Sequence, residues 1–265
     1  MKIQEIHSTS HPLLKRLKKL QRVSKEEDYF LVEGTHAIEE ALACDWPLDC
    51  VVCTQRWLDN HRTQLRHFQK SCYCVPDPWL AQAVTTESPD GVAAIACAPN
   101  LATNRSNYNS LLRGLSLAII TDGVQDPGNV GTLLRSIVAV SADGLFLSED
   151  SVHPLHPKLI RSTAGQWFRK PPQRVNIAAF LDAAKSLGIQ ILVASAAGES
   201  LWKSDLRRPT LLIVGSEGAG VKASVASMAS GSVSIPMAQN VESLNVGIAG
   251  TLVLYESKRQ RDATK

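Results

Sequence analysis

Long hydrophobic runs are missing from this chain of 265 residues. No apolar stretch reaches the roughly 18 residues that a membrane-spanning helix needs, and the segment after Met1 lacks the apolar centre of a signal peptide. The composition is that of a soluble globular protein, with 44% hydrophobic and 20% charged residues. These absences argue against a membrane protein and a secreted protein, and we expect a cytoplasmic enzyme.

Cysteine is absent after residue 97. The six cysteines are Cys44, Cys50, Cys53, Cys72, Cys74 and Cys97. Cys50 and Cys53 with Cys72 and Cys74 could offer four thiolates to a zinc ion. However, residues 48–53 are predicted to form a strand, on which residues three apart point to opposite faces. We therefore favour buried structural cysteines over zinc, and over a disulfide in a cytosolic chain.

The usual nucleotide-binding signatures are also missing. The turn from Gly215 to Gly220 follows a predicted strand, but Val221 stands where a phosphate-binding loop needs lysine. The spacing of a dinucleotide-binding loop fails as well, because Ala223 takes the place of its third glycine. A purely structural glycine turn is one alternative, and Glu217, an acid among these glycines, argues against it.

An excess of one charge is lacking overall, since 28 basic and 25 acidic residues leave a net charge of +3. The basic residues are nevertheless clustered. The clusters are Lys15, Arg16, Lys18, Lys19, Arg22 and Lys25; then Lys158, Arg161, Arg169, Lys170 and Arg174; and finally Lys258, Arg259 and Arg261. A solvated helix face has the same pattern, but three such clusters favour a polyanion such as nucleic acid.

What is present suggests two α/β domains. In the first hundred residues, leucines at helical spacing over 11–23 precede predicted strands at 29–33, 48–53, 73–75 and 92–96. Thr35 is placed to cap the helix that follows the first of these strands. Residues 98–110 are polar and weakly periodic, as a linker would be. We predict domains at 1–98 and 115–265, joined by a linker at 99–114.

The second domain alternates strands and helices. Predicted strands lie at 117–120, 144–147, 189–194, 210–214 and 233–235, and a last helix runs from Ser243 to about Arg259. Apolar strands between helices predict a mainly parallel sheet that is covered on both faces. Polar segments follow three of these strands, at the edge where such sheets bind ligands.

Single residues in these segments allow two interpretations. Asn129 and Ser243 are each in place to cap a helix, which needs no further function. Arg135 lies within the first turns of a predicted helix, where the helix dipole disfavours a cation. An arginine at that position therefore indicates an anionic partner, such as a phosphate.

At these residues the chain resembles the SpoU/TrmH class of RNA 2′-O-ribose methyltransferases, in the SPOUT superfamily. The class has three motifs. They correspond here to Asn129, Gly131 and Arg135; to Gly215, Glu217, Gly218 and Gly220; and to Ile235, Pro236 and Met237 with Ser243, Leu244, Asn245 and Val246. The first domain resembles the class's ribosomal-protein-like RNA-binding domain, through residues 30–34 and 38–42. Gln166-Trp167 departs from the smaller apolar residues of many members.

This resemblance implies a fold, a cofactor and a set of site residues. The fold would be an α/β trefoil-knot methyltransferase domain behind a smaller N-terminal α/β domain, in a homodimer formed through the C-terminal domain. S-adenosylmethionine would be the methyl donor, without a metal. The cofactor residues would be Gly215, Gly218, Ile235, Met237 and Leu244, and the catalytic residues would be Arg135, Asn129, Glu217, Ser243 and Asn245. Independently of the resemblance, the first basic cluster predicts RNA binding at Lys15, Arg16, Lys18, Lys19 and Arg22.

Several alternatives stay open at this point. Arg135 could act as a base or could only stabilise developing charge on the ribose oxygen. Ribosomal RNA is favoured over transfer RNA as the substrate. A methyltransferase of the same superfamily that modifies bases, and a non-catalytic RNA-binding protein that retains the fold, are the rival functions.

Overall fold

The computed structural model describes residues 2–23, 28–101 and 105–263. The chain forms two compact units. The first consists of Met1–Pro99 with Leu155–Arg169, and the second of Asn100–Pro154 with Lys170–Lys265. The first unit is discontinuous in sequence, because residues 155–169 from the second half of the chain belong to it. The continuous domain limits predicted from the sequence stay a prediction.

The first unit is built on a mixed five-stranded sheet. Its strands are β1 (Lys2–Glu5), β2 (Tyr29–Glu33), β3 (Leu48–Cys53), β4 (Ser71–Cys74) and β5 (Val92–Cys97). They lie in the order β1-β4-β3-β5-β2, in which β4 is parallel to both of its neighbours and β5 is antiparallel to both of its own. The helices are α1 (Pro12–Leu20), α2 (Thr35–Ala43), α3 (Gln55–His61), α4 (Asp77–Ala81), α7 (Pro157–Ser162) and α8 (Gln166–Arg169).

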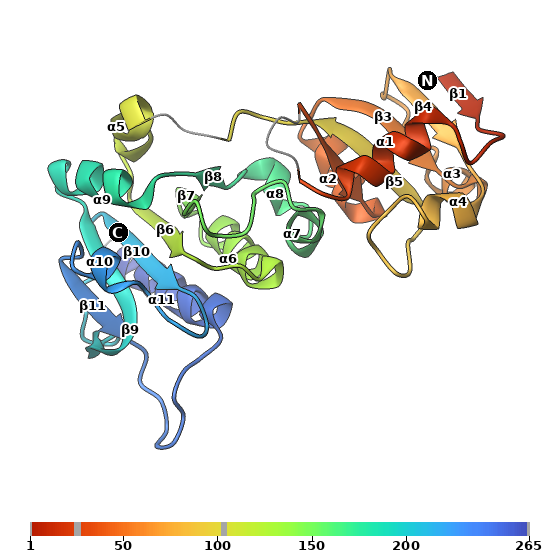
Figure 1. The fold of residues 1–265 in the computed structure, drawn as a ribbon. Helices are drawn as coiled ribbons and strands as arrows, with labels where there is room; N and C mark the ends of the chain where they lie inside the picture. The colour runs from red at the N-terminus through yellow and green to blue at the C-terminus, as the bar shows by residue number, and fades with distance from the viewer. Residues whose placement is uncertain (1, 24–27, 102–104, 264–265) are drawn as a thin grey trace. The chain divides into compact units, whose positions relative to one another are not determined.

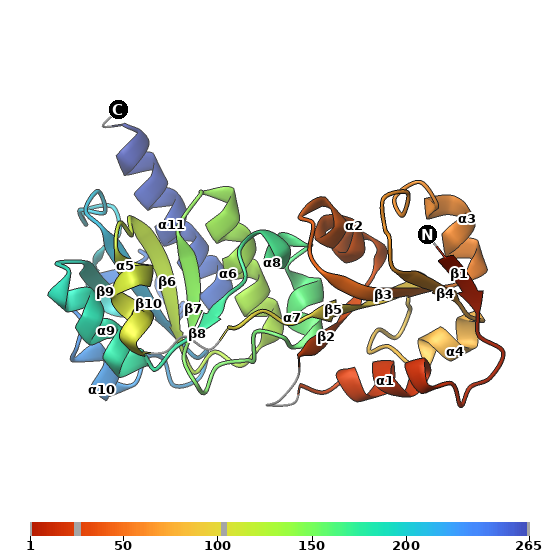
Figure 2. The same cartoon turned by 90° about the horizontal axis from the view of Figure 1, so that it is seen from above.

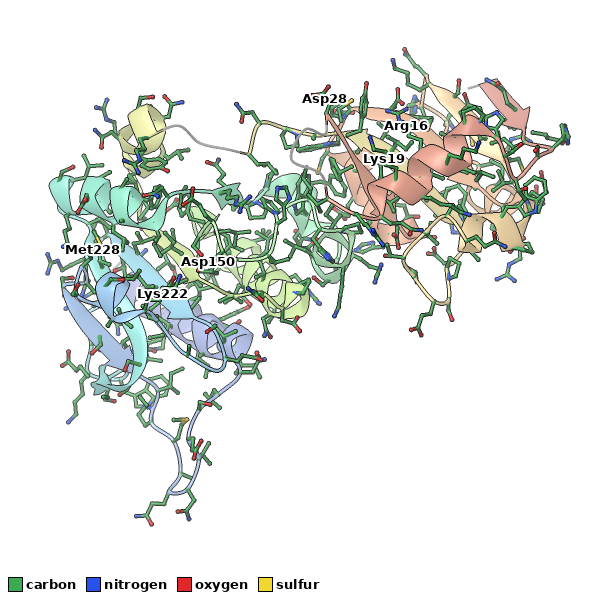
Figure 3. The ribbon with its side chains drawn as sticks, viewed as in Figure 1. Arg16, Lys19, Asp28, Asp150, Lys222 and Met228 are labelled. Atoms are coloured by element: carbon green, nitrogen blue, oxygen red, sulfur yellow. The ribbon has the colours of Figure 1, made fainter. Side chains whose placement is uncertain are left out.

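Helix α1 forms because its leucines make one apolar stripe. Leu13, Leu14, Leu17 and Leu20 are all buried, as expected for an amphipathic helix on a sheet. His11 caps the helix by accepting a hydrogen bond from the Leu13 N–H at 3.2 Å. The basic side chains between the leucines remain on the outer side, where Figure 3 labels Arg16 and Lys19.

The segment 155–169 belongs to the first unit through aromatic and ionic contacts. The Trp167 side chain is fully buried, with ring centroids 4.9 Å from Phe30 and 5.1 Å from Trp46. Arg161 donates to the buried Glu33 carboxylate at 2.9 Å. Trp167, which departs from the family pattern, is thus a core residue of this unit.

The second unit contains a six-stranded sheet. Its strands are β6 (Leu117–Asp122), β7 (Gly144–Leu147), β8 (Gln173–Arg174), β9 (Gln190–Ser200), β10 (Thr210–Gly215) and β11 (Gly231–Ser234). They lie in the order β11-β9-β10-β6-β7-β8, and each neighbouring pair is parallel. The predicted fold class, α/β with a mainly parallel sheet and a smaller N-terminal α/β domain, is confirmed.

Helices cover both faces of this sheet (Figures 1 and 2). On one face, α6 (Pro127–Ala139) and α11 (Val246–Asp262) run side by side and contact β6, β7 and β10. The two helices approach closely, because a Cβ atom at Gly250 would lie 2.4 Å from Leu133. On the other face, α5 (Tyr108–Leu112), α9 (Ile177–Ser186) and α10 (Ala223–Ala226) enclose the main apolar core of the unit.

Part of the predicted linker is ordered structure. A short 3₁₀ helix, η1 (Arg105–Asn107), leads into α5. Tyr108 and Leu112 are buried in the core, and the Tyr108 hydroxyl accepts from the Asn176 N–H at 2.8 Å. Two apolar residues spaced by one helical turn were too weak a pattern to reveal this helix within a polar sequence.

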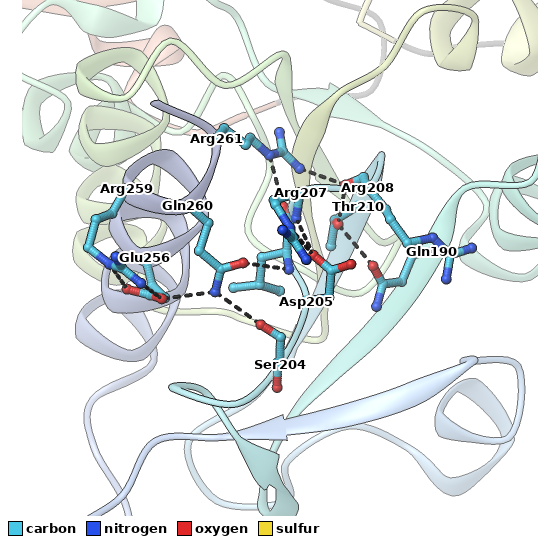
Figure 4. A network of polar contacts seen from close by, with 11 residues as sticks. Gln190, Ser204, Asp205, Arg207, Arg208, Thr210, Glu256, Arg259, Gln260 and Arg261 are labelled. Atoms are coloured by element: carbon cyan, nitrogen blue, oxygen red, sulfur yellow. Dashed lines mark hydrogen bonds and ion pairs between the residues drawn. The ribbon is translucent and has the colours of Figure 1, made fainter. Parts of the chain in front are cut away.

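The last turns of α11 are tied to the segment before β10 (Figure 4). Gln260 donates to the Ser204 carbonyl at 3.0 Å and accepts from the Leu206 N–H at 2.9 Å. Arg261 donates to the Leu206 carbonyl and to the Ser116 carbonyl, and burial lowers its pKa. Arg259 forms two hydrogen bonds with Glu256. The third basic cluster therefore stabilises the fold.

No helix among the described residues is both long and apolar enough to cross a membrane.

Candidate active site

The three polar segments meet at the carboxyl edge of the parallel sheet. β6 ends at Asp122 and β10 at Gly215, and these two residues are partners in the ladder. The first segment follows Asp122 into α6, and the second follows Gly215. The third leads from β11 to α11, which packs beside α6.

The ends of the two helices differ from the sequence-based interpretation. Asp126 caps α6, because its carboxylate accepts from the Gly128 and Asn129 N–H groups at 2.5 and 3.3 Å. Asn129 therefore lies inside the helix, and the alternative interpretation of this residue as a cap was wrong. The Asp126-Pro127 pair is a typical helix start and could have revealed this.

Helix α11 begins at Val246, later than predicted. Asn245 is its cap, since the side-chain carbonyl accepts from the Gly247 and Ile248 N–H groups at 3.0 and 3.3 Å. Ser243 precedes the helix and does not cap it. In the first unit the prediction of Thr35 as a cap was also wrong, because Gly34 holds the cap position of α2.

Asn129, Glu217 and Asn245 form a hydrogen-bonded group that we call the polar triad. Asn129 Nδ2 donates to Glu217 Oε1 at 2.6 Å. Asn245 Nδ2 donates to the same oxygen at 3.0 Å and to Asn129 Oδ1 at 2.8 Å. One residue from each of the three segments thus contributes to a single cluster, although 28 to 116 positions separate them in the sequence.

Arg135 lies on the exposed side of α6 and outside the polar triad. It is well past the first turn of a helix that begins at Pro127. The argument from the helix dipole was therefore wrong, since that effect is confined to the first turn. Within the described residues its guanidinium makes no hydrogen bond or ion pair, so its fork of donors is available to a ligand. An anionic partner stays a prediction.

An apolar cavity of about 130 Å³ lies beside the third segment. Four residues of the predicted site line it, namely Ile235, Met237, Ser243 and Leu244. The rest of the lining comes from Ala194, Ser195 and Ala196 of β9, from Ala249 and Val253 of α11, and from Val233 and Glu242. The cavity is small but opens to the surface, and its apolar lining suits the flat, partly apolar adenosyl part of a nucleoside cofactor.

The wall at β9 exists because the strand makes a wide bulge. Val193 pairs with Ser232 and Glu199 with Val233, so residues 194–198 loop out between two consecutive partners on β11. A Cβ atom at Gly198 would lie 2.7 Å from the β11 backbone, and only glycine permits this approach.

Gly215 and Gly218 do not line the apolar cavity. A Cβ atom at Gly215 would lie 2.1 Å from the Gly220 backbone, across a turn closed by Ser216 and Gly220 at 2.9 and 3.2 Å. This close approach explains Gly215 without a ligand. Gly218 has open space around it. A cofactor role for these two glycines stays a prediction.

The turn after β10 is fixed by a lysine that the sequence analysis missed. The Lys222 N–H donates to Asp122 Oδ2 at 2.8 Å, and its ammonium group lies 3.5 Å from Asp122 Oδ1. The ammonium group also pairs with Asp150, and Figure 3 labels both residues. Hydrogen bonding to Lys222 lowers the pKa of Asp150. A lone lysine beside glycines gives no sign of partners that lie 72 and 100 positions away.

Of the basic residues predicted to bind RNA, Arg16 has a partner in the fold. It pairs with Asp49 at 2.6 Å, and its guanidinium lies 4.3 Å from the centre of the Tyr29 ring. Lys15, Lys18, Lys19 and Arg22 are exposed. In the second cluster, Arg161, Arg169, Lys170 and Arg174 all donate to protein acceptors. Lys25 lies outside the described residues.

Three of the six cysteines, Cys50, Cys53 and Cys72, are buried in the first unit. Cys50 faces the core that α1 covers, and burial raises its pKa to about 12. Cys53 faces Cys72 with a distance of 3.6 Å between the sulfur atoms. Among the described residues no group of His, Cys, Asp and Glu is arranged to hold a metal ion.

The fold and the site define an RNA methyltransferase. The model of the SpoU rRNA Methylase family matches residues 116–255, and that of the MRM3-like substrate binding domain matches residues 11–94. The chain belongs to the SpoU rRNA Methylase family. The predicted family and enzyme class are thereby confirmed.

Several relatives are similar over nearly the whole chain. An uncharacterised tRNA/rRNA methyltransferase from Synechocystis is 35% identical, covering 98% of this chain and 95% of the relative. The 23S rRNA (guanosine(2553)-2'-O)-methyltransferase RlmP from Bacillus subtilis is 28% identical, covering 96% and 98%. The SpoU methyltransferase AviRb from Streptomyces viridochromogenes, solved in complex with the cofactor AdoMet, superposes with a TM-score of 0.81 at 26% identity, covering 96% and 99%.

Proposed function

We propose that this enzyme transfers the methyl group of S-adenosylmethionine to a ribose 2′-hydroxyl of ribosomal RNA. The polar triad is the observation that carries the proposal, because it joins all three segments of the site at one carboxylate. Relatives named as 23S rRNA 2′-O-methyltransferases support the substrate and the position of methylation.

S-adenosylmethionine supplies an electrophilic methyl group on a sulfonium when it is bound. The apolar cavity fits its apolar parts, with Ile235, Met237 and Leu244 as the residues that would hold it. Main-chain groups beside Gly215 and Gly218 would serve its polar parts. Asn245 follows Leu244 directly, so the cavity and the polar triad share a stretch of chain.

Methyl transfer is mainly a matter of position, because a ribose oxygen must be aligned with the methyl carbon. The two amides of the polar triad hold Glu217 Oε1, and within the described residues Oε2 has no hydrogen-bond partner. Oε2 can therefore accept a hydrogen bond from the ribose hydroxyl and orient its oxygen. Ser243, in the same loop as Leu244, would hold the local backbone.

Arg135 would bind the phosphate beside the target ribose and stabilise negative charge that develops on the 2′-oxygen. Its guanidinium is suited to a phosphate because it offers two parallel donors. As a base it is poor, since its pKa in water lies above about 12. We therefore assign Arg135 an electrostatic role, and Glu217 Oε2, which would accept the hydrogen bond of the 2′-hydroxyl, would take the proton that the oxygen loses.

The rest of the RNA would bind to the first unit. The exposed side of α1 presents Lys15, Lys18, Lys19 and Arg22 within the residues that match the substrate binding domain. Such charges bind phosphates without selecting a sequence. Arg16 would contribute less, because Asp49 already neutralises it.

The functional form would be a homodimer through the second unit. On α11, Ile248 and Tyr255 are 50% and 51% exposed, and two helical turns place them on one face. A second copy on this face would bury apolar surface next to α6, which carries Arg135. Each site would thus be completed at the interface.

The test is a methylation map of ribosomal RNA from cells with and without the gene. A 2′-O-methyl group blocks alkaline cleavage at its nucleotide, so one position should become cleavable when the gene is lost. The purified chain with S-adenosylmethionine should restore the block. Methylation of transfer RNA or of a base would contradict the proposal. Failure to bind S-adenosylmethionine in calorimetry would instead support a non-catalytic RNA-binding protein.

A further inference from the structure

A second hollow, of about 340 Å³, borders the polar triad and shares no lining residue with the apolar cavity. Asn129 and Glu217 line it, and the rest of its wall comes from Ser216 and from residues 123–126. Its volume is in the range of small-ligand sites. Because it shares Glu217 with the polar triad, a group bound here would lie next to the oxygen that is methylated.

The charge of this hollow disfavours a phosphate. Two carboxylates, Asp126 and Glu217, line it, and no lysine or arginine is among its lining residues within the described chain. Like charges at such short range repel. The neutral parts of an RNA nucleotide are its ribose and its base, so the lining is suited to a nucleoside.

Gln125 is a lining side chain with both a free donor and a free acceptor. It is exposed, and within the described residues its amide has no hydrogen-bond partner. An amide offers both donors and an acceptor, which matches the mixed edge of a nucleobase. By contrast, Asp126 is occupied as the cap of α6.

The backbone holds Gln125 in place from both sides. Val124 is buried, its N–H donates to Ser151 at 3.2 Å, and its carbonyl accepts from the Val152 N–H at 2.9 Å. Asp126 is fixed by its capping bonds. The backbone at Gln125 is thus fixed, and only its side-chain rotamer has to be ordered when a ligand binds.

The turn that carries Ser216 and Glu217, which also line the hollow, is held by hydrogen bonds and ion pairs as well. Lys222 ties the end of the turn that carries Ser216 and Glu217 to Asp122 and Asp150. Ser148 donates to Asp150 at 2.6 Å and accepts from the Gly123 N–H at 3.0 Å. The same hydrogen-bond network therefore also contacts the 123–126 side of the hollow. Both parts of the lining thus depend on one network.

We propose that this hollow receives the base of the target nucleotide and that Gln125 reads the edge of that base. A base in a stacked helix cannot reach such a hollow, so it must be unpaired or turned out of the stack. The inference rests on the proposed function for the ribose that the base accompanies, but it concerns a binding site that can be tested without turnover.

The first test uses the full chain with S-adenosylhomocysteine and each of the four nucleosides. The side-chain amide signal of Gln125 in a ¹⁵N spectrum, identified by its loss in Gln125→Ala, should shift with at least one nucleoside. Gln125→Ala should weaken that binding at least about fivefold, the size of one good base contact. Gln82→Ala, at another exposed glutamine, is the matched control and should bind normally. If no nucleoside moves the Gln125 signal, the inference is wrong.

The second test measures base preference during methylation. RNA fragments that differ only in the base at the methylated position are compared. The wild type should prefer one base, and Gln125→Ala should reduce that preference at least about fivefold, with unchanged affinity for S-adenosylmethionine. An unchanged preference in Gln125→Ala would overturn the inference. If no RNA is methylated, the proposed function fails, and the nucleoside test still decides on this hollow.

Discussion

At the scale of the residue, Asn245 serves the fold and the site at once. Its side-chain oxygen caps α11, while its side-chain nitrogen donates to Glu217 and Asn129. Because both ends of the amide are used, its orientation is fixed. The position of Glu217 therefore depends on the start of a helix and not on a flexible loop.

Arg135 differs, because its guanidinium bonds to none of the residues that the structure describes. We expect Arg135→Ala to lower kcat/KM by at least about 100-fold, the size of a lost electrostatic contact to a developing anion. The melting temperature and the affinity for S-adenosylmethionine should stay within error, since the side chain is exposed and unbonded among the described residues. Single-turnover kinetics with calorimetry provide the measurement.

Arg135→Lys is the second variant for this prediction. It keeps the charge but loses the planar fork, so an intermediate rate is expected. Single-turnover methylation near the wild-type rate in Arg135→Ala, with RNA binding intact, would falsify the assignment.

The polar residues of the site could be predicted from the sequence, but their contacts could not. Glu217 was singled out because an acid among glycines is unusual. That it bonds Asn129 and Asn245 depends on which strands are neighbours in the sheet, and local sequence does not contain that information. A helix cap was one of two interpretations of Asn129 and Ser243, because each precedes an apolar helix by a suitable distance, yet Asp126 and Asn245 satisfy the first N–H groups.

At the scale of the element, α1 carries exposed lysines and one arginine, Arg16, that is paired with Asp49. We expect Lys15→Ala with Lys19→Ala to weaken RNA binding and to reduce the dependence of log K on log salt by about 1 for each lysine. The free energy of unfolding should be unchanged, because both side chains are exposed. Filter binding over a range of salt concentrations, with urea unfolding, gives both quantities.

Arg16→Ala is the matched contrast on the same helix. It should lower the free energy of unfolding by about 1 kcal/mol, through the loss of the Asp49 pair and the Tyr29 contact, and should change the salt dependence little. Lys185→Ala, on α9 of the second unit, is the control for a lysine outside the proposed RNA surface. An unchanged salt dependence in the double lysine variant would remove α1 from that surface.

Strands were predicted more accurately than helix ends or short elements. β2, β3 and β7 have the predicted limits, because apolar runs between turn residues define them. β1 and β8 were missed, since one is mainly polar and the other has two residues. Basic clusters were the least reliable signal, because tertiary contacts decide whether an arginine such as Arg261 is free or bonded.

At the scale of the whole molecule, we expect the chain to be a dimer that Ile248→Lys converts to a monomer. The charge would have to be buried in the interface, which is costly without a partner. Because Ile248 is exposed in the single chain, its replacement should leave the fold intact. Sedimentation equilibrium measures the mass, and the methylation rate should fall together with the dimer fraction.

Leu187→Lys is the control for this prediction, because Leu187 is another exposed apolar residue of the second unit, 41% exposed and outside α11. It should remain dimeric. A wild-type monomer at assay concentrations, or a dimeric Ile248→Lys, would rule out an interface on this face.

The division of the chain into two units also limits how its domains can be exchanged by recombination. The first unit is encoded in two pieces, because it needs Leu155–Arg169 from within the methyltransferase sequence. Phe30 and Trp46 pack on Trp167 of that segment, so a gene fusion at the linker would transfer only part of the module. A recombinant that exchanges the N-terminal domain with that of a relative must carry residues 155–169 along with it.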